Sequence, residues 1–150
     1  PISFKEAYDE IDKNFNYMCK EILNNSIGNL SLLDETDLLE SGVELMVKFK
    51  NKKYQSLSLL SGGEKSMVAV ALIMAIFMYK PSPFTFFDEI EAALDESNTK
   101  RLLRKLKEFT DRSQFILITH NKHTMKESDQ LYGVTMNKEI GESKILSVVL

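Results

Sequence analysis

The chain has 150 residues, a hydrophobic content of 43% and a formal net charge of −3. This length suits one domain with a hydrophobic core, and the weak acidity gives no general electrostatic attraction to nucleic acid. The single cysteine, Cys19, excludes an internal disulfide and a cysteine zinc cluster, which fits a reduced, cytoplasmic setting. No signal sequence is visible, and because the chain begins with Pro1 rather than methionine we expect a piece of a longer protein.

Apolar residues at alternating spacings of four and three predict a helix at the start of the chain, ending near Asn24. We interpret the later part of this seam as the core face of an amphipathic helix. Its first turns leave a continuing coiled coil open as an alternative. The seam consists of Phe4, Tyr8, Ile11, Phe15, Met18 and Ile22.

The next segment carries the signals of short strands. Residues 30–33 are expected to form a strand, and 34–42 an acidic, solvated loop. Residues 42–50 alternate between apolar and polar side chains, as in a half-buried strand. A tight turn at 51–53 is expected to return the chain as a partner strand at 54–57.

The stretch LSLLSGGEK organises the chain. Ser61 and Glu64 have the S-x-x-E spacing of a capping box, which predicts a helix from this point to about Tyr79. The backbone amides of Gly62 and Gly63, the serine hydroxyl and the positive helix end would then converge on one spot that favours an anion, phosphate above all. The alternative is a simple turn feeding a buried helix. The apolar run Met67–Met78 is too short to span a bilayer, so we expect a buried helix and no membrane.

A second informative stretch is PFTFFDEIEAALDE. Phe84 to Phe87 is apolar except for Thr85 and follows two prolines, as expected for a strand buried on both faces. It ends in Asp88 and Glu89, and adjacent carboxylates at such a strand end need a cation or a reacting water. The simplest use is that Asp88 holds Mg²⁺ while Glu89 takes a proton from water.

The rest of the chain predicts a parallel strand–helix–strand unit and a hairpin. A helix is expected to about Phe109, with a basic face over 100–107 that is either solvated or tracks DNA phosphates. Residues 114–119 form the second strand, so Asp88, Glu89 and His120 should meet at one sheet edge. His123 is taken as a surface residue. The tail, 131–136 and 144–150, is expected to form a hairpin that closes the sheet.

Four motifs in order resemble the carboxy-terminal half of the ATPase head of SMC proteins, which belong to the ABC ATPase superfamily. They are LSLLSGGEK, KPSPFTFFDEIEAALDE, QFILITHNKHTM and LYGVTM. The resemblance implies an α/β fold, a mainly parallel sheet flanked by helices with a short antiparallel hairpin at the tail. It also divides the chain into a helix at a coiled-coil junction (1–24), strands and loops before the signature (25–60) and the remainder from signature to hairpin (61–150).

The resemblance implies a role for each motif residue. Glu89 and His120 would be catalytic, as base and switch histidine, and Asp88 would bind Mg²⁺. Ser61, Gly62 and Gly63 would form the signature motif that contacts the ATP of an opposing head, together with Asp95 of the D-loop. The glycine-rich phosphate loop, G-x-x-x-x-G-K-[ST], occurs nowhere in the sequence, so this chain alone should not bind ATP well.

The resemblance therefore implies partners and a process. The partners are the amino-terminal half of the head, a second head in an expected homodimer, a kleisin subunit and DNA. The process is ATP-driven chromosome condensation and segregation in the cytoplasm, at the nucleoid. The alternatives are a transporter nucleotide-binding domain, as the nearest competitor within the superfamily, the head of a coiled-coil DNA-repair ATPase, and a non-catalytic kleisin-docking module.

Overall fold

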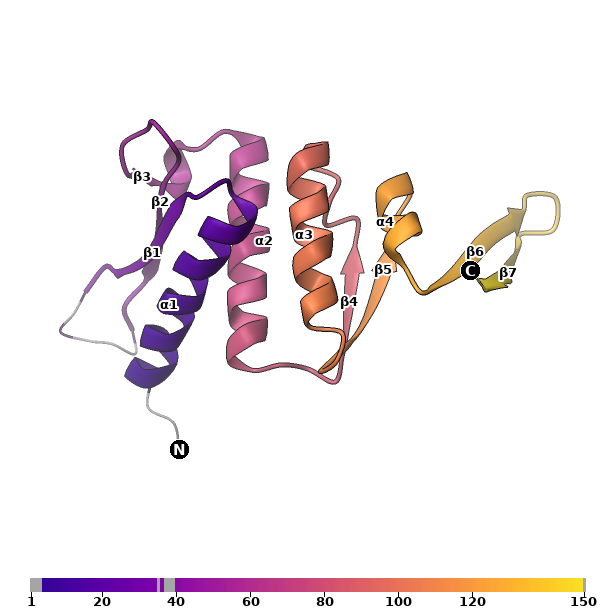
Figure 1. Cartoon of the computed structure of the whole chain (residues 1–150), viewed down its shortest axis with the longest axis horizontal. Coiled ribbons are helices and arrows are strands. Elements are labelled where there is room, and N and C mark those ends of the chain that lie inside the picture. The colour runs from indigo at the N-terminus through magenta and orange to yellow at the C-terminus, as the bar shows by residue number, and fades with distance from the viewer. Residues whose placement is uncertain (1–3, 35, 37–39, 150) are drawn as a thin grey trace. The chain divides into compact units, whose positions relative to one another are not determined.

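The computed structural model describes residues 4–34, 36 and 40–149, and the chain divides into two compact units, Pro1–Ile118 and Thr119–Leu150. The first unit begins with α1 (Phe4–Ile22), as the heptad spacing predicts (Figure 1). An antiparallel sheet follows, in the order β1 (Ile27–Leu32), β2 (Val43–Lys48), β3 (Gln55–Ser56). The predicted strands are confirmed, although β1 starts earlier than expected, and the predicted acidic loop lies partly outside the described residues.

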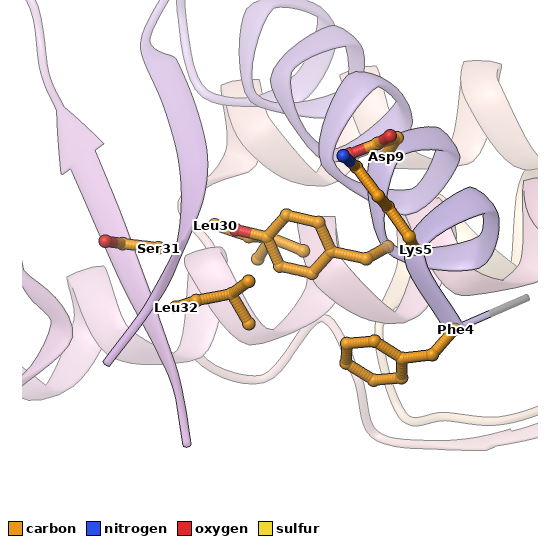
Figure 2. Close-up of a pocket in the computed structure, with 7 residues that line it drawn as sticks. Phe4, Lys5, Asp9, Leu30, Ser31 and Leu32 are labelled. Atoms are coloured by element: carbon orange, nitrogen blue, oxygen red, sulfur yellow. The ribbon is translucent and has the colours of Figure 1, made fainter. Parts of the chain in front are cut away.

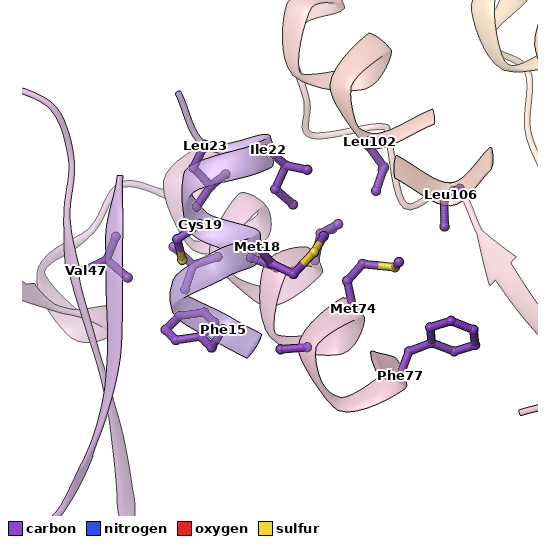
Figure 3. Close-up of a cluster of buried hydrophobic side chains, with 14 of the residues drawn as sticks. Phe15, Met18, Cys19, Ile22, Leu23, Val47, Met74, Phe77, Leu102 and Leu106 are labelled. Atoms are coloured by element: carbon purple, nitrogen blue, oxygen red, sulfur yellow. The ribbon is translucent and has the colours of Figure 1, made fainter. Parts of the chain in front are cut away.

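α1 packs between this sheet and the long apolar helix α2 (Gly62–Tyr79). Figure 3 shows Phe15 and Cys19 on the side of α1 that faces Val47 of β2, and Met18 toward Met74 of α2. The later part of the predicted seam is therefore core, as expected, because Phe15, Met18 and Ile22 are all buried. The early residue Phe4 is exposed.

α1 and β1 approach each other closely at Gly28. A Cβ placed at Gly28 would lie 2.8 Å from Cε1 of Phe15 and would clash with Sγ of Cys19. Real Cβ atoms do not make such contacts, so a glycine is needed for steric reasons at this crossing. Burial raises the pKa of the Cys19 thiol to about 12, and the thiol serves as a small apolar group in the core.

α2 follows a 3-10 turn, η1 (Leu57–Leu59), and contributes six buried side chains to the core. It has 18 residues, more than the run counted from sequence, and its length and composition would allow it to cross a membrane. Its place in the core instead supports the predicted core helix, although Ile73 and Ile76 are exposed. The buried side chains are Val68, Val70, Ala71, Met74, Ala75 and Phe77.

β4 (Phe84–Asp88) and β5 (Gln114–Ile118) form the predicted parallel pair, and α3 (Glu96–Glu108) connects them. The prediction of a mainly parallel sheet is wrong for this chain, because β4 and β5 are the single parallel pair among the described strands. The expected burial of β4 on both faces is also wrong, since Phe84 and Phe86 are 55% and 63% exposed. Among the described residues, β5 is the one strand that pairs with β4, so the other edge of β4 has no partner strand there.

One lysine of α3 contradicts the expectation of a uniformly solvated or DNA-tracking basic face. The side chain of Lys105 is only 3% exposed, and its ammonium forms ion pairs with Glu21 of α1 and Glu108 of α3. The lysine lies at the junction of the two helices, where a charged group must be paired to be tolerated.

The second unit contains α4 (Lys122–Glu127) and an antiparallel hairpin, β6 (Gln130–Asn137) with β7 (Glu142–Val149). The chain turns between the strands at Gly141, whose φ of 69° suits glycine. The predicted hairpin is confirmed. The expectation that it closes the main sheet is wrong within the described residues, where β6 and β7 form a sheet of their own.

Candidate functional site

The signature turn is a complete capping box. Ser61 is the N-cap of α2, and its Oγ accepts a hydrogen bond from the Glu64 amide at 3.4 Å. The Glu64 carboxylate in turn accepts from the Ser61 amide, at 3.1 Å, and from the Ser61 hydroxyl, at 3.0 Å. These reciprocal bonds set the start of the helix at the predicted residue.

The same turn presents an open surface at the helix start. Ser61, Gly62 and Gly63 are exposed, and a Cβ added at either glycine would meet nothing within 4 Å. The first helical bond of the helix runs from the amide of Lys65 to the carbonyl of Ser61, at 2.9 Å. The amides of the two glycines precede that bond, so they have no acceptor within the helix. Two amides at a positive helix end can bind one oxyanion, and the Ser61 hydroxyl can join them when its proton turns from Glu64 to the anion.

A lysine from the turn before β3 is tied to the capping box. Lys52 Nζ lies 2.6 Å from Oε1 of Glu64. The hydrogen bond from Lys52, followed by the backbone bond from Ser61, holds the pKa of Glu64 below its usual value. Glu64 is therefore a charged group with partners on both of its oxygens.

Asp88 and Glu89 lie where β4 ends, as predicted. Both side chains are exposed, and β4 itself is only partly buried. The Glu89 amide still donates to the carbonyl of Ile118, at 2.9 Å, so it continues the pairing with β5. Its φ is 47°, in the left-handed region that a non-glycine residue occupies at a cost on the order of 1–3 kcal/mol. A residue keeps such a strained backbone conformation only where the surrounding structure holds it in place. Residues of this kind cluster at functional sites.

Asp95, predicted to act in the D-loop, is the N-cap of α3. Its Oδ1 accepts from the Asn98 amide at 2.7 Å, and its Oδ2 from the Asn98 side chain at 3.3 Å. The carboxylate is exposed and supports the helix end. Its predicted contact with nucleotide stays a prediction.

His120 belongs to the second unit, where it is exposed and precedes α4. Asn121 caps that helix by accepting from the His123 amide at 2.8 Å. The expected proximity of His120 to the carboxylate pair is not described by the structure and stays a prediction. His123 was expected at the surface but is partly buried beside the cap.

The donor set limits the metal that this chain could hold. Among the described residues, no group of three or more histidine, cysteine or carboxylate side chains is positioned for a metal ion. Mg²⁺, however, commonly uses one or two carboxylates and completes its shell with waters and phosphate oxygens. The exposed pair Asp88 and Glu89 fits that partial role, and the open turn of Gly62 and Gly63 fits a phosphate.

Three charged residues have surroundings that were not predicted from sequence. Lys52 carries no local motif, and Lys105 looked like part of a solvated face. The third is Glu91, two residues beyond the predicted base, which is only 6% exposed although it is a carboxylate. A buried acid has to be paired, and the run of acids in DEIE was the available signal.

A separate open cleft of about 420 Å³ lies between the start of α1 and β1 (Figure 2). Its aromatic wall is formed by Phe4 and Tyr8, whose rings are stacked with centroids 6.3 Å apart. None of the predicted site residues lines it. The remaining lining residues are Lys5, Asp9, Leu30, Ser31 and Leu32.

Solved structures define the class of protein. One, described as "Structural biochemistry of ATP-driven dimerization and DNA stimulated activation of SMC ATPases", matches with a TM-score of 0.87 and 34% identity over 97% of this chain and 87% of that chain. Another, the SmcHead bound to the C-winged helix domain of ScpA, matches with a TM-score of 0.88 and 35% identity over 97% of this chain and 45% of that chain. The chain therefore has the fold of an SMC ATPase head, α/β with small sheets and helices.

Sequence comparison gives the family. The protein family described as "RecF/RecN/SMC N terminal domain" matches residues 7–142, and the chain belongs to this family. A curated relative, the chromosome partition protein Smc of Fusobacterium nucleatum, is 69% identical over 96% of this chain. The chain spans 12% of that relative's length. The family description names an amino-terminal domain, which differs from the carboxy-terminal half implied by the motifs.

Proposed function

We propose that this chain is the carboxy-terminal half of an SMC head and contributes to ATP hydrolysis at a composite site between two engaged heads. Its exposed signature turn would cover the ATP of the opposing head, and the carboxylate of Glu89, whose backbone has a φ of 47°, would activate water in its own head. The single observation that carries the proposal is the outward-facing capping turn, with Ser61 exposed and the Gly62 and Gly63 amides beyond the helical bonds. The proposed segments 1–24, 25–60 and 61–150 follow from the same assignment.

Motif content supports the carboxy-terminal assignment over the amino-terminal one in the family description. The phosphate loop expected of an amino-terminal half is missing from all 150 residues. The signature turn at Ser61, the carboxylates at the end of β4 and His120 instead follow one another in the order of the resemblance. This chain covers 87% of one solved SMC chain, so the two are similar in length. That similarity fits a segment of this size as a distinct half of a head.

The exposed face of β4 supports a missing half. Phe84 and Phe86 stand in edge-to-face contact, with ring centroids 6.0 Å apart, and both are more than half exposed. Ile118, opposite Asp88 on β5, is also exposed. Large apolar groups gathered on a strand face mark an interface, and parallel strands are normally covered on both faces. We assign this face to the half of the head that carries the phosphate loop.

The chemistry assigned to this chain has two parts. The hydroxyl of Ser61 and the amides of Gly62 and Gly63 donate to a terminal phosphate, so head engagement depends on that phosphate. At the other site, the Glu89 carboxylate accepts a proton from an in-line water, and Asp88 is the Mg²⁺ ligand. When bound, Mg²⁺ neutralises charge that develops on the phosphate oxygens. His120 is proposed to donate to the same phosphate.

Two substitutions in the complete protein test this proposal. Glu89→Gln should preserve ATP-dependent head association and lower turnover by about 10²- to 10⁴-fold, because the general base is lost. Ser61→Arg should abolish association, and Ser58→Arg, at an exposed serine just before the turn, should not. Undiminished turnover in Glu89→Gln, or normal association in Ser61→Arg, would contradict the assigned roles.

A second, compatible candidate is docking of a kleisin subunit on the tail hairpin. Tyr132, Val134 and Met136 alternate along β6, and Val134 lies opposite Ile145 of β7, so these side chains share one face. All four are exposed. A relative of this fold was solved with the C-winged helix domain of ScpA. Val134→Glu should weaken binding of the kleisin's carboxy-terminal domain, whereas Lys138→Glu in the connecting turn should not.

DNA remains a proposed partner, and nucleoid association and chromosome segregation are proposed at the level of the whole protein. One solved relative of this fold is described by DNA-stimulated activation. On this chain, Lys100 pairs with Glu96 at 2.6 Å and Lys105 is buried, so fewer cations of α3 are free for phosphate than the sequence indicates.

A further inference from the structure

Lys52 is held in place by the turn between β2 and β3. Its amide donates to the carbonyl of Phe49 at 3.0 Å, which closes a turn with Asn51 at a φ of 66°. The Lys52 ammonium also lies 5.6 Å from the centre of the Phe49 ring. Asparagine tolerates this backbone region, so the turn is well defined and directs the lysine toward the start of α2.

Glu64 divides its two oxygens between Lys52 and Ser61. Oε1 accepts from the Lys52 ammonium at 2.6 Å, while Oε2 accepts from the amide and the hydroxyl of Ser61. The lysine is thereby linked, through one carboxylate, to the serine that opens the signature turn. The lowered pKa of Glu64, with Lys52 as the main cause, agrees with this pairing.

The capping carboxylate creates an electrostatic problem for the proposed function. Glu64 stabilises the helix start, but its negative charge lies beside the amides that are proposed to receive a phosphate. An unpaired carboxylate there would repel the incoming anion and would hold the serine hydroxyl as its own donor. A cation on the far oxygen reduces both effects.

We propose that Lys52 is a positioning residue for the signature turn, which neutralises Glu64 so that the Ser61 hydroxyl and the glycine amides can donate to the phosphate of the ATP held by an opposing head. The proposal rests on the proposed function and adds a residue outside the signature motif to it. The neighbouring cations do not fill this role, because within the described residues neither Lys53 nor Lys65 forms an ion pair.

The test is ATP-dependent head association in the complete protein carrying Glu89→Gln, so that nucleotide persists. Lys52→Met should raise the ATP concentration needed for half-maximal association by about three- to tenfold, as expected for one charge near an anion. Lys53→Met, in the same turn, should change it by less than about twofold. Lys52→Arg should restore association, and the effect of Lys52→Met should shrink as salt is raised.

The decisive comparison is the double-mutant cycle. If Lys52 acts by neutralising Glu64, Lys52→Met should have little effect in a Glu64→Gln background, where the cap is retained but the charge is gone. Equal losses in both backgrounds, or no loss from Lys52→Met alone, would overturn the proposal. If Ser61→Arg fails to block association, the proposed function itself is wrong. If Ser61→Arg blocks it and Lys52→Met is silent, only the role of Lys52 is wrong.

Discussion

Replacing Lys105 by methionine tests how α1 is joined to α3. The Lys105 ammonium lies 2.9 Å from the Tyr17 hydroxyl, 2.8 Å from Glu21 and 2.7 Å from Glu108. It also lies 5.0 Å from the centre of the Tyr17 ring. Burial acts to lower the pKa of Lys105, but the hydrogen bonds with Glu108, Glu21 and Tyr17 outweigh it and raise the pKa above its ordinary value of 10.5.

The expected cost of Lys105→Met lies between two limits. Exposed ion pairs contribute roughly 0.2–1 kcal/mol, whereas stranding a buried charge costs roughly 3–5 kcal/mol. The substitution strands no buried charge, because the side chains of Glu21 and Glu108 are 35% and 52% exposed and can be hydrated. Methionine also keeps much of the buried stem. We therefore expect a loss of about 1–2 kcal/mol in the free energy of unfolding.

Removing the partners should cost more than removing the lysine. The double substitution Glu21→Ala and Glu108→Ala leaves the Lys105 charge buried at 3% exposure, so its cost should approach about 3 kcal/mol or more. Urea unfolding of the complete head measures both values, and Lys100→Met, at an exposed pair on the same helix, is the control. A loss from Lys105→Met that equals or exceeds that of the double variant would refute this reasoning.

Three further outcomes follow from the geometry. Gly28→Ala should lower the free energy of unfolding by about 1–3 kcal/mol through its clash with Phe15 and Cys19, and Cys19→Ala should recover part of that loss in a double-mutant cycle. The Cys19 thiol, with its pKa raised to about 12, should react with a thiol reagent only after urea unfolds the head. The folded pKa of Glu64 lies below its ordinary 4.5, so its stabilisation is present above pH 4.5 and is lost as pH falls further; Glu64→Gln should flatten that part of the acid unfolding curve.

Local sequence signals predicted the parts of the fold that local interactions determine. The capping box at Ser61 and Glu64 was readable because both partners lie within one helical turn of each other. The turn at Asn51 and the hairpin around Gly141 were likewise marked by residues that adopt positive φ. The helix α2 followed from the cap and its continuous apolar run.

Features that depend on distant partners could not be predicted. Lys105 looked solvated because its partners Tyr17 and Glu21 lie in a helix far earlier in the chain. Phe84 and Phe86 looked buried because apolar runs usually belong to central strands, and the pattern does not reveal whether the covering neighbours belong to the same segment. The strained φ of Glu89 has no sequence signature apart from its position at a strand end.

The proposed head would have two interfaces of different physical character on this chain. The face with Phe84 and Phe86 is aromatic, and burying it is favourable under all ionic conditions, which suits a permanent partner such as the other half of the head. The turn at Ser61 and Gly62 offers only a hydroxyl, amides and a helix end, which gain little from contact unless an anion is present. The first contact would make one stable head from two halves, while the second would form only with a phosphate and end with its loss. Under the proposed function, this separation would let nucleotide hydrolysis release the partner head while the two halves of each head stay together.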